Sequence, residues 1–507
     1  MRAALLTCVV LLLSACSAPP SSSNSPPTFH IVGGGINGAS QLTPEAARGA
    51  SRLQLLCSDP QMSQSFDWAE RQAMSYARNS GDPVGPWIEG GEPGRESFCM
   101  RDMSHQSMGA HALGLDANIH NMMRRFAENI SESRDWCSYW GMTRENQPRR
   151  VDFEDDAHFW YCLPANFDVL DCCYRMYLWS GDDSYMTDPV FLNFFDRSMH
   201  DYVQRWGLAP NQLPTRPRLL NVRGILDPTD KFQRNRGIPG YNEQAHGYTV
   251  EIDLVAKEFT AFCDYAYIEQ ERGDDDEANW ALQQAAAIKQ LVNTLFWNQP
   301  DQSFYLRLDQ NHKPEGVSGP ILLDNSLVDD PKRIKAALTG AGPDALYRWG
   351  NPDQANAQMI DIALGNKARR DYPEVSFTWI GTFVNGTMGI TLEADMPDIA
   401  WTKGNWVRTI VRTRSGLGAK IAWAELRHLP IRDNYITVRH DGQTKTTVTN
   451  ESGPAFIWRP AFLGSHATLL VNGTPVTALV EHDALGRAMS SIRVTVGAGG
   501  RVIVQVP

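Results

Sequence analysis

Charged side chains gather in one short stretch of the chain, directly before an apolar pattern with helical spacing. The stretch reads GRESFCMRDMSH and contains, in order, Arg95, Glu96, Arg101, Asp102 and His105. A guanidinium group presents a rigid planar set of donors, so two arginines in this setting can grip a carboxylate or a ring of hydroxyls. A network of structural ion pairs that pins a loop explains the same residues. The stretch therefore predicts a polar site without deciding its role.

Four further segments combine aromatic rings with carboxylates or amides, each where a loop meets a predicted helix. They are WCSYW with the acidic and aromatic run after it, PANFD, PGYNE with the residues up to 251, and DYPEVSF. Sugars are recognised in this way, because their apolar ring faces stack on aromatic rings while their hydroxyls need fixed donors and acceptors. For Asn166 and Asp168, capping of a helix start is an alternative. The side chains that we expect to line a sugar subsite are Arg95, Glu96, Arg101, His105, Trp140, Tyr161, Asn166, Asp168, Tyr241 and His246.

Hydrolysis of a glycosidic bond needs two carboxyl groups, one of which must be protonated. A carboxyl group among aromatic rings tends to have a raised pKa, which favours a general acid. Glu243 lies between two tyrosines and is the predicted acid. Glu374 lies between a tyrosine and a phenylalanine and is the predicted second carboxylate, with Asp102 as the alternative base. Helix capping by Glu243 or Asp102, and an ion pair of Glu374 with Arg369 or Arg370, are the structural alternatives.

The first residues predict the cellular compartment. A positive start, a short apolar run and the sequence LSAC at residues 13–16 form a signal peptide with a bacterial lipoprotein cleavage box, so Cys16 is the predicted lipidation site. The apolar run is too short to span a bilayer. Residues 17–60 form a tether and an N-terminal extension. We expect a protein that contacts the membrane only through a lipid anchor, at the outer membrane of a bacterial cell envelope. An ordinary secretory signal is the alternative.

Charge and cysteine content exclude several classes of function. The formal net charge is −11 and the chain has no long basic run, so nucleic acid is not an expected partner. The cysteines after Cys16 form no CxxC pair, and His105 and His111 are spaced so that they do not share a helix face. No metal site is therefore predicted. No phosphate-binding glycine loop occurs, and no cofactor is expected. No Gly-x-Ser-x-Gly elbow occurs, which argues against a serine hydrolase.

Periodicity divides the rest of the chain into two parts. Between residues 61 and 398, apolar residues recur at helical spacing in segments separated by long aromatic loops. From 399 to 507, short alternating runs and turns such as Asp441-Gly442 predict an antiparallel β-sandwich. Paired helices followed by a small β domain favour a mainly α fold, an α-toroid with an accessory sandwich. The predicted helices include 103–115, 119–130, 167–178, 190–206, 250–268, 278–296, 355–364 and 377–390.

Four runs carry a resemblance to a known superfamily. GRESFCMRDMSHQSMGAHALGL, FAENISESRDWCSYW, FWYCLPANFDVLD and YPEVSF together resemble the six-hairpin glycosidases, the (α/α)6-toroid glycoside hydrolases of polysaccharide-utilisation systems in Gram-negative bacteria. Within that superfamily the chain resembles glycoside hydrolase family 154, the β-glucuronidase type. The resemblance implies a ring of six helical hairpins with the active site at one mouth. It also implies inversion with a water nucleophile, and Arg95 and Arg101 as partners of a uronate carboxylate.

These observations lead to one hypothesis and two alternatives. The hypothesis is a glycoside hydrolase that releases β-linked glucuronic acid, or another sugar, from an oligosaccharide or polysaccharide by general acid/base catalysis. A polysaccharide lyase shares the combination of α-toroid and β-sandwich, and it would abstract a proton with Tyr241, His246 or Tyr248; an unsaturated uronyl hydrolase is a related variant. A lipoprotein that only binds glycans at the cell surface is the last alternative, and the carboxylates embedded among aromatic rings count against it.

Overall fold

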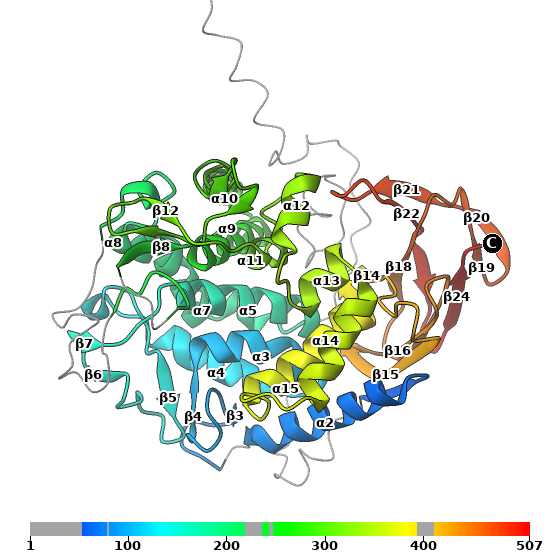
Figure 1. Ribbon diagram of the computed structural model, residues 1–507. Helices are drawn as coiled ribbons and strands as arrows, with labels where there is room; N and C mark the ends of the chain where they lie inside the picture. Colours follow the sequence, from blue (N-terminus) through cyan, green and yellow to red (C-terminus); the bar gives the residue numbers. More distant parts are fainter. Residues whose placement is uncertain (1–52, 79–80, 218–235, 243–246, 393–409) are drawn as a thin grey trace, which may run out of the picture.

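The structure is a computed structural model that describes residues 53–78, 81–217, 236–242, 247–392 and 410–507. Within these ranges no helix is both long and apolar enough to cross a membrane. Figure 1 shows the helices gathered in one part of the molecule and the later strands in another. Several predictions fall outside the described residues and stay predictions: the signal peptide, Cys16 as the lipidation site, most of the tether, Glu243, His246, and the domain boundary at 398.

The first part of the chain is helical, as predicted. Its longer helices are α2 (Pro60–Tyr76), α3 (Met100–Ala112), α4 (Asp116–Glu128), α5 (Pro164–Ser180), α7 (Pro189–Arg197), α9 (Ile252–Arg272), α10 (Asp275–Leu295), α14 (Pro352–Leu364) and α15 (Pro373–Thr382). Shorter helices are α6 (Ser184–Thr187), α8 (Val203–Trp206), α11 (Pro320–Asp324), α12 (Pro331–Ala337) and α13 (Pro343–Trp349). Wider π-helical turns at Ser198–Tyr202 and Phe383–Thr387 follow α7 and α15, within the predicted helices 190–206 and 377–390.

Proline marks the start of most of these helices. It is the first residue of α2, α5, α7 and each of α11 to α15. Its missing N–H is unpaired at that position in any helix, and its fixed φ already suits the helix. Side chains of Asp59, Asp188, Asp330 and Asn351 then accept hydrogen bonds from N–H groups of the first turn in four of them. These local signals fix which residues lie in the first turns.

Short strands, which the sequence did not reveal, lie between the helices. β4 (Ser97–Cys99) pairs with β5 (Gly141–Thr143) and leads directly into α3, so this pairing fixes the start of that helix. The other pairs are β2 (Ala77–Arg78) with β3 (Trp87–Ile88), β6 (Phe153–Asp155) with β7 (His158–Phe159), β9 (Trp297–Asn298) with β10 (Ser303–Phe304), and β11 (Arg307–Asp309) with both β8 (Tyr248–Glu251) and β12 (Pro314–Glu315).

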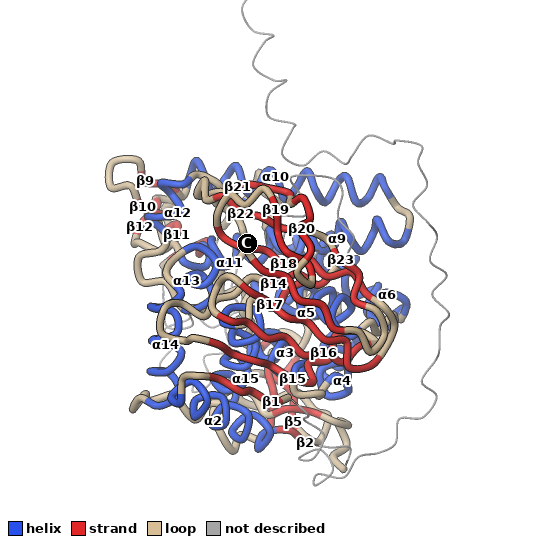
Figure 2. The backbone as a smooth tube through the Cα atoms, turned by 90° about the vertical axis from the view of Figure 1, so that its right-hand side faces the viewer, coloured by secondary structure: helices blue, strands red, loops and turns tan. Residues whose placement is uncertain are grey.

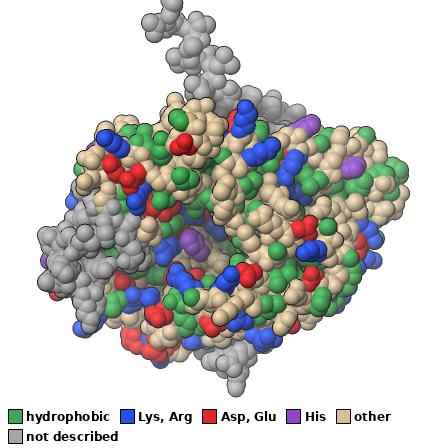
Figure 3. Space-filling view, viewed as in Figure 1, with side chains coloured by type: hydrophobic (Ala, Val, Ile, Leu, Met, Phe, Trp, Pro, Cys, Tyr) green, Lys and Arg blue, Asp and Glu red, His purple; other side chains and the backbone are tan. Residues whose placement is uncertain are grey.

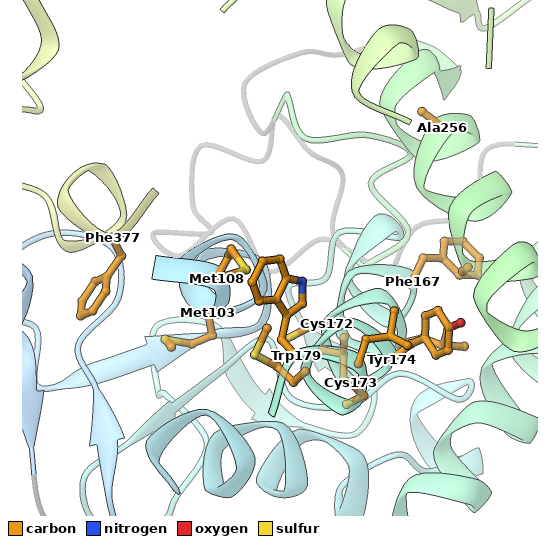
Figure 4. Packing of buried hydrophobic residues seen from close by; sticks show 14 of the residues in the cluster. Met103, Met108, Phe167, Cys172, Cys173, Tyr174, Trp179, Ala256 and Phe377 are labelled. Carbon is orange, nitrogen blue, oxygen red and sulfur yellow. The ribbon is translucent and has the colours of Figure 1, made fainter. Parts of the chain in front are cut away.

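The contacts between helices form a closed circuit. α15 packs against α3, α3 against α5, α5 against α9, α9 against α11, and α11 against α13. α13 then contacts the turn at Phe383–Thr387 that continues α15, which completes the circuit. Helices α2, α4, α10, α12 and α14 pack against its members. Figure 4 shows part of the core between α3, α5 and α15, where Met103, Met108, Trp179 and Phe377 are buried. Burial of each such side chain stabilises the fold by about 1.5–3 kcal/mol.

Backbone contact joins α3 and α15. A Cβ atom on Gly109 would lie 1.9 Å from the carbonyl oxygen of Phe377, and one on Gly381 would lie 3.3 Å from the backbone nitrogen of Gly109. Glycine is therefore required at position 109. Asp102 precedes Gly109 by two helical turns, and Glu374 precedes Gly381 by the same interval. This close packing brings the first turns of the two helices, and their carboxyl groups, into electrostatic range of each other.

Two main sheets follow the helices, and both recruit strands from before residue 399. The seven-stranded sheet has the order β1-β15-β16-β17-β24-β19-β20, and the other runs β13-β14-β18-β22-β21 with β23 paired to β18. β1 (Gln54–Cys57) pairs with β15 although it lies in the predicted N-terminal extension, and β13 (Ile390–Leu392) lies in the predicted helical domain. The remaining strands are β14 (Val411–Thr413), β15 (Trp423–Ile431), β16 (Asn434–Asp441), β17 (Lys445–Ser452), β18 (Phe456–Leu463), β19 (Thr468–Val471), β20 (Thr474–Thr477), β21 (Leu479–His482), β22 (Ala488–Ser491), β23 (Val494–Val496) and β24 (Arg501–Gln505).

Hydrogen bonds attach these sheets to the helical part. The predicted hairpin around Asp441-Gly442 is present as β16 and β17. His440 of β16 lies with its Nε2 atom 2.8 Å from the carbonyl oxygen of Met388, and the Nε2 atom of the buried His111 lies 3.0 Å from that of Pro430. Figure 2 shows the strands lying across the near face of the molecule with the helices behind them. The sheets thus support the ends of α3 and α15 that lie away from their first turns.

Candidate active site

Four carboxyl groups lie near the N-terminal ends of helices that belong to the circuit. Asp102, Asp253 and Glu374 lie in the first turns of α3, α9 and α15, and Asp168 is the fifth residue of α5. Helix N-termini carry partial positive charge and unpaired N–H groups, so they favour acidic side chains. The face of the molecule seen in Figure 3 is hollowed, and acidic, basic and histidine side chains gather in and around the hollow. The fold therefore concentrates charged groups from distant parts of the sequence.

Glu374 is a carboxyl group whose pKa lies near neutral pH. Burial, reinforced by the negative charge of Asp102, raises its pKa to about 7. Its Oε2 atom is buried and has no hydrogen-bond partner in the described structure, while Arg369 lies 3.5 Å from Oε1. The ion pair with Arg369 that the sequence offered as an alternative role is therefore present. Arg369 is largely exposed, so its charge is screened by solvent and does not offset the burial.

Asp102 lies within electrostatic range of Glu374 and has two polar neighbours. The buried Cys99 thiol donates a hydrogen bond to Oδ2 over 2.8 Å, and Nε of Arg101 lies 3.8 Å from Oδ1. Gly90 and Gly91 lie close against the side chain, since a Cβ atom on either would be 3.4 Å from an atom of Asp102. Asp102 does not act as an N-cap, because Cys99 is the residue before the helix and no side chain caps it. The capping alternative for Asp102 is therefore wrong.

Arg101 is fixed in a stack of aromatic rings. Its guanidinium carbon lies 5.7 Å from the ring centre of Trp140 and 5.3 Å from that of Tyr241. Nη1 donates to the carbonyl oxygen of Tyr241 over 3.4 Å. Stacking and a backbone acceptor hold the planar fork in one orientation, so little side-chain freedom is lost when it binds an anion. The structure thus brings together three of the predicted subsite residues.

A buried polar cluster centred on Asp168 lies beside this stack. The Tyr241 hydroxyl donates to the Asp168 carboxylate at 2.6 Å from each oxygen, and His105 Nε2 and Lys257 Nζ lie 3.7 and 3.5 Å from Oδ1. Burial opposes ionisation of Asp168, but the charge of Lys257 and the bonds from His105 and Tyr241 outweigh it and lower the pKa. Asp168 is fully buried. It therefore positions Tyr241 and His105, and it is enclosed too completely to touch a substrate itself.

The loop before β8 is held by two buried carboxyl groups. The backbone N–H of Tyr241 donates to Asp253 Oδ2 over 2.6 Å, and that of Asn242 donates to Glu251 Oε2 over 3.2 Å. A Cβ atom on Gly240 would lie 2.1 Å from Glu251 Oε2, so glycine is required there. Burial together with the neighbouring Glu251 raises the pKa of Asp253 to about 8, and burial raises that of Glu251. These two groups fix the loop that carries Tyr241.

Of four further predicted subsite residues, Tyr161, Asn166 and Glu96 lie elsewhere, and Arg95 lies near Asp102. Tyr161 and Asn166 are fully buried and bond to each other, and the Asn166 amide donates to the carbonyl oxygen of Trp136, so both support the loop and the prediction of sugar contact is wrong for them. Glu96 is exposed and pairs with Arg144 at 2.8 Å, so its role is a surface ion pair. Arg95 is half-exposed, lies 3.5 Å from Glu92, and flanks Gly91 together with Asp102.

Sequence reasoning missed three residues of the site. Lys257 lies inside the apolar pattern of α9, where a single lysine gives no signal. The sequence pattern assigns no role to Cys99 or Asp253, and only the fold shows their contacts with Asp102 and the Tyr241 loop. In the described part of the chain, no three His, Cys, Asp or Glu side chains are arranged to hold a metal ion, and the described cysteines are unbridged.

The raised pKa of Glu374 predicts a pH-dependent contribution to stability. The pKa is about 7 in the folded protein against an ordinary value of 4.5. The unfolded state therefore releases this proton more easily, so the contribution is fully present below pH 4.5 and is lost as the pH rises through 7. Relative to Glu374→Gln, the free energy of unfolding of the wild type should fall by up to about 3 kcal/mol between pH 5 and pH 8. Urea unfolding of both proteins at these two pH values measures it. Parallel pH dependence in the two proteins would contradict the prediction.

Comparison with known proteins adds the fold class. A scan against protein-family models and a search of curated proteins each found no match. Among solved structures, an α-L-rhamnosidase from Dictyoglumus thermophilum matches with TM-score 0.53 and 11% identity over 90% of this chain and 50% of that chain. A sialidase matches with TM-score 0.52 and 11% identity over 91% and 42%. A protein described as a kojibiose phosphorylase, from the human microbiome, matches with TM-score 0.51 and 10% identity over 90% and 68%.

These matches define a class by its fold alone. The chain spans half or less of the rhamnosidase and sialidase chains. At about 10% identity the likeness shows that the helical body and the strand-rich region together share the architecture of enzymes named for their action on sugars. Activity and substrate have to be argued from the site.

Proposed function

We propose that this protein is a glycoside hydrolase. The observation that carries the proposal is the pair formed by Asp102 and Glu374, which close packing of α3 and α15 brings near each other and in which the pKa of Glu374 is raised to about 7. Two carboxyl groups whose environments separate their protonation states are the requirement for acid/base cleavage of a glycosidic bond. The shared fold with carbohydrate-active enzymes supports the same conclusion.

The two carboxyl groups take different roles in this proposal. Glu374 donates its proton to the leaving oxygen, and Asp102, oriented by Cys99, activates water as the general base. This assignment differs from the sequence-based hypothesis, in which Glu243 was the acid and Glu374 or Asp102 the base. Glu374 now takes the role of acid. Glu243 lies outside the described residues and stays a rival for the role of acid.

The closed circuit of helices supports the finer fold prediction. α3, α5, α9, α11, α13 and α15 contact one another in order, and helices from between or before them pack against this circuit. We propose that they are the inner and outer helices of an (α/α)6 toroid, with the two sheets as the accessory sandwich. The candidate carboxyl groups lie at the N-terminal ends of these helices, which supports an active site at one mouth of the toroid.

Uronic acid is the sugar we propose for the subsite. Arg101 presents an oriented guanidinium next to Asp102, and Arg95 and the same carboxylate both lie near the Cβ position of Gly91. A uronate carboxylate matches the planar donors of arginine. The rings of Trp140 and Tyr241 both lie near Arg101 and offer apolar surface to a sugar ring beside it.

Two alternatives fit the geometry less well. A lyase needs a base, yet the hydroxyls of Tyr241 and Tyr248 both act as donors, to Asp168 and to the Asn242 carbonyl oxygen. Burial, together with the charges of Asp168 and Glu251 respectively, raises the pKa of both tyrosines well above 10. A phosphorylase uses phosphate as the nucleophile and has no need of a base for water, whereas Asp102 is placed to serve as one.

One incubation separates these alternatives. The purified protein is mixed with uronate-bearing oligosaccharides, and free uronate, sugar phosphate and absorbance from a new carbon–carbon double bond are followed together. We expect free uronate with unchanged absorbance, at a rate that inorganic phosphate does not raise. The rate should fall above pH 7 as Glu374 loses its proton. Rising absorbance would establish a lyase, phosphate-dependent sugar phosphate a phosphorylase, and binding without any product a glycan-binding protein.

A further inference from the structure

We propose that Cys99 is a positioning residue for Asp102, whose thiol orients the carboxylate with a hydrogen bond weak enough to leave it a good base. The inference rests on the proposed function, because it assigns Asp102 the role of activating water. The contact itself is a property of the structure, with the thiol 2.8 Å from Oδ2. The two statements are therefore tested by different measurements below.

The backbone of Cys99 is fixed by its neighbours. Cys99 ends β4, which pairs with β5, and the N–H of Met100 donates to the carbonyl oxygen of Trp140 over 3.1 Å. The ring of Phe98 packs 6.0 Å from Trp87 and 5.4 Å from Phe126, measured between ring centres. The thiol is therefore presented to the first turn of α3 from a rigid support, and the cysteine is buried. A substitution at Cys99 changes the donor while this support stays in place.

Asp102 is buried and is bordered by Gly90 and Gly91. A Cβ atom on either glycine would lie 3.4 Å from an atom of the Asp102 side chain, at ordinary van der Waals distance. Arg101 lies beside Oδ1 at 3.8 Å, which is longer than a hydrogen bond. Burial and the charge of Asp102 raise the pKa of the Cys99 thiol well above its usual value, so the thiol keeps its proton and remains the donor.

The contrast with Asp168 shows why a thiol matters here. Asp168 accepts from a tyrosine hydroxyl and lies beside a histidine and a lysine, so its lone pairs are engaged and its charge is neutralised. Asp102 receives its hydrogen bond from sulfur, the weakest donor among these groups. A carboxylate held by a weak donor keeps its direction but retains lone-pair capacity for water. Aspartate thus anchors the Tyr241 loop at position 168, whereas at position 102 it is available to act on water.

Replacing the thiol by a hydroxyl or by hydrogen should move the pH profile in opposite directions. Cys99→Ser supplies a stronger donor, which stabilises the ionised carboxylate, so the acid limb of kcat/KM should move down by about half a pH unit or more. Cys99→Ala supplies none, so the limb should move up and kcat should fall about tenfold as the carboxylate loses its orientation. The matched control is Cys173→Ala, which removes a different buried thiol, located on α5, and should leave the acid limb unmoved. A purely structural role for Cys99 would lower activity without moving the limb, and that result would overturn the proposal.

Infrared spectroscopy tests the contact without a substrate. The difference spectrum between wild type and Cys99→Ala isolates the S–H stretching band of Cys99 in the intact protein. We expect the same band, isolated in Asp102→Asn, to lie at higher frequency, because an amide oxygen accepts a hydrogen bond more weakly than a carboxylate oxygen. An unchanged frequency would overturn the thiol–carboxylate contact. A changed frequency in a protein that cleaves no glycoside would leave the contact established and refute the hydrolase and the positioning role together.

Discussion

Asp102→Asn is expected to lower kcat for glycoside hydrolysis by about a thousandfold while leaving the fold and substrate binding in place. Asparagine keeps the volume of the side chain and can still accept the hydrogen bond from Cys99, but it cannot take a proton from water. General base catalysis contributes about 10²–10⁴ in rate, which sets the size of the loss. Steady-state kinetics together with calorimetric titration of a uronate-bearing oligosaccharide would separate lost turnover from lost binding.

Glu374→Gln should behave differently from Asp102→Asn, because the two residues act on different bonds. With an oligosaccharide, whose leaving group needs a proton, the loss should again be about a thousandfold. An aryl glycoside releases a phenolate, which leaves without protonation. With this substrate Glu374→Gln should lose less turnover than with the oligosaccharide, whereas Asp102→Asn should still lose about a thousandfold. The glutamine variant should also lose the fall in rate above pH 7 that the raised pKa of Glu374 produces.

A matched control keeps this comparison specific. Glu145 is an exposed carboxylate that lies 3.7 Å from Arg144 on the surface, so Glu145→Gln removes a charge without touching the hollow. Its turnover should stay within about twofold of wild type. Full turnover in both Asp102→Asn and Glu374→Gln would refute the pair as the catalytic machinery. Full turnover in Glu374→Gln alone would return the role of acid to Glu243.

Local signals in the sequence predict the helices well, but not their arrangement. Apolar spacing marked most long helices to within a few residues, although several predicted starts fall a few residues after the proline that begins the helix. The short helices α11 to α13 carry too little periodicity to be seen, although two of them complete the circuit. β15 was missed because it contains Pro430 and a register shift between Leu426 and Leu429, and both disguise the alternation of a strand.

The candidate site was predictable by residue type and only partly by position. Aromatic rings around carboxylates pointed to Asp102, Asp168, Tyr241 and Glu374, and the fold brings the first three into one continuous set of contacts through Arg101. The pairing of Asp102 with Glu374 depends on the packing of α3 against α15, which joins residues far apart in the sequence. Burial also decides which predicted residues can meet a substrate. Asp168 and Tyr161 are enclosed whereas His105 is partly exposed, and no pattern in the sequence records that difference.

Gly109→Ala is expected to destabilise the protein by about 3 kcal/mol and to impair the site at the same time. In an exposed helix this change would stabilise by up to about 1 kcal/mol, because alanine is the better helix former. Here the added Cβ atom would lie 1.9 Å from the carbonyl oxygen of Phe377, which is backbone and has no rotamer to move. Overpacking of this kind costs about 1–3 kcal/mol, and the helices must separate to relieve it. Urea unfolding and kcat on the same preparations measure both effects.

Separation of α3 and α15 is what links the loss of stability to the loss of activity. Asp102 lies two turns before Gly109 and Glu374 lies about one turn before Phe377, so a shift at this contact changes the distance between the two carboxyl groups. The charge of Asp102 helps to raise the pKa of Glu374, so the fall in rate at alkaline pH should begin at lower pH in the variant. Gly342→Ala, where a Cβ atom meets nothing within 4 Å, should change neither property. Gly381→Ala, with its milder 3.3 Å contact, should fall between the two. If Gly109→Ala were as stable as Gly342→Ala, the helices would not be in backbone contact, and the packing that pairs the two carboxyl groups would be wrong.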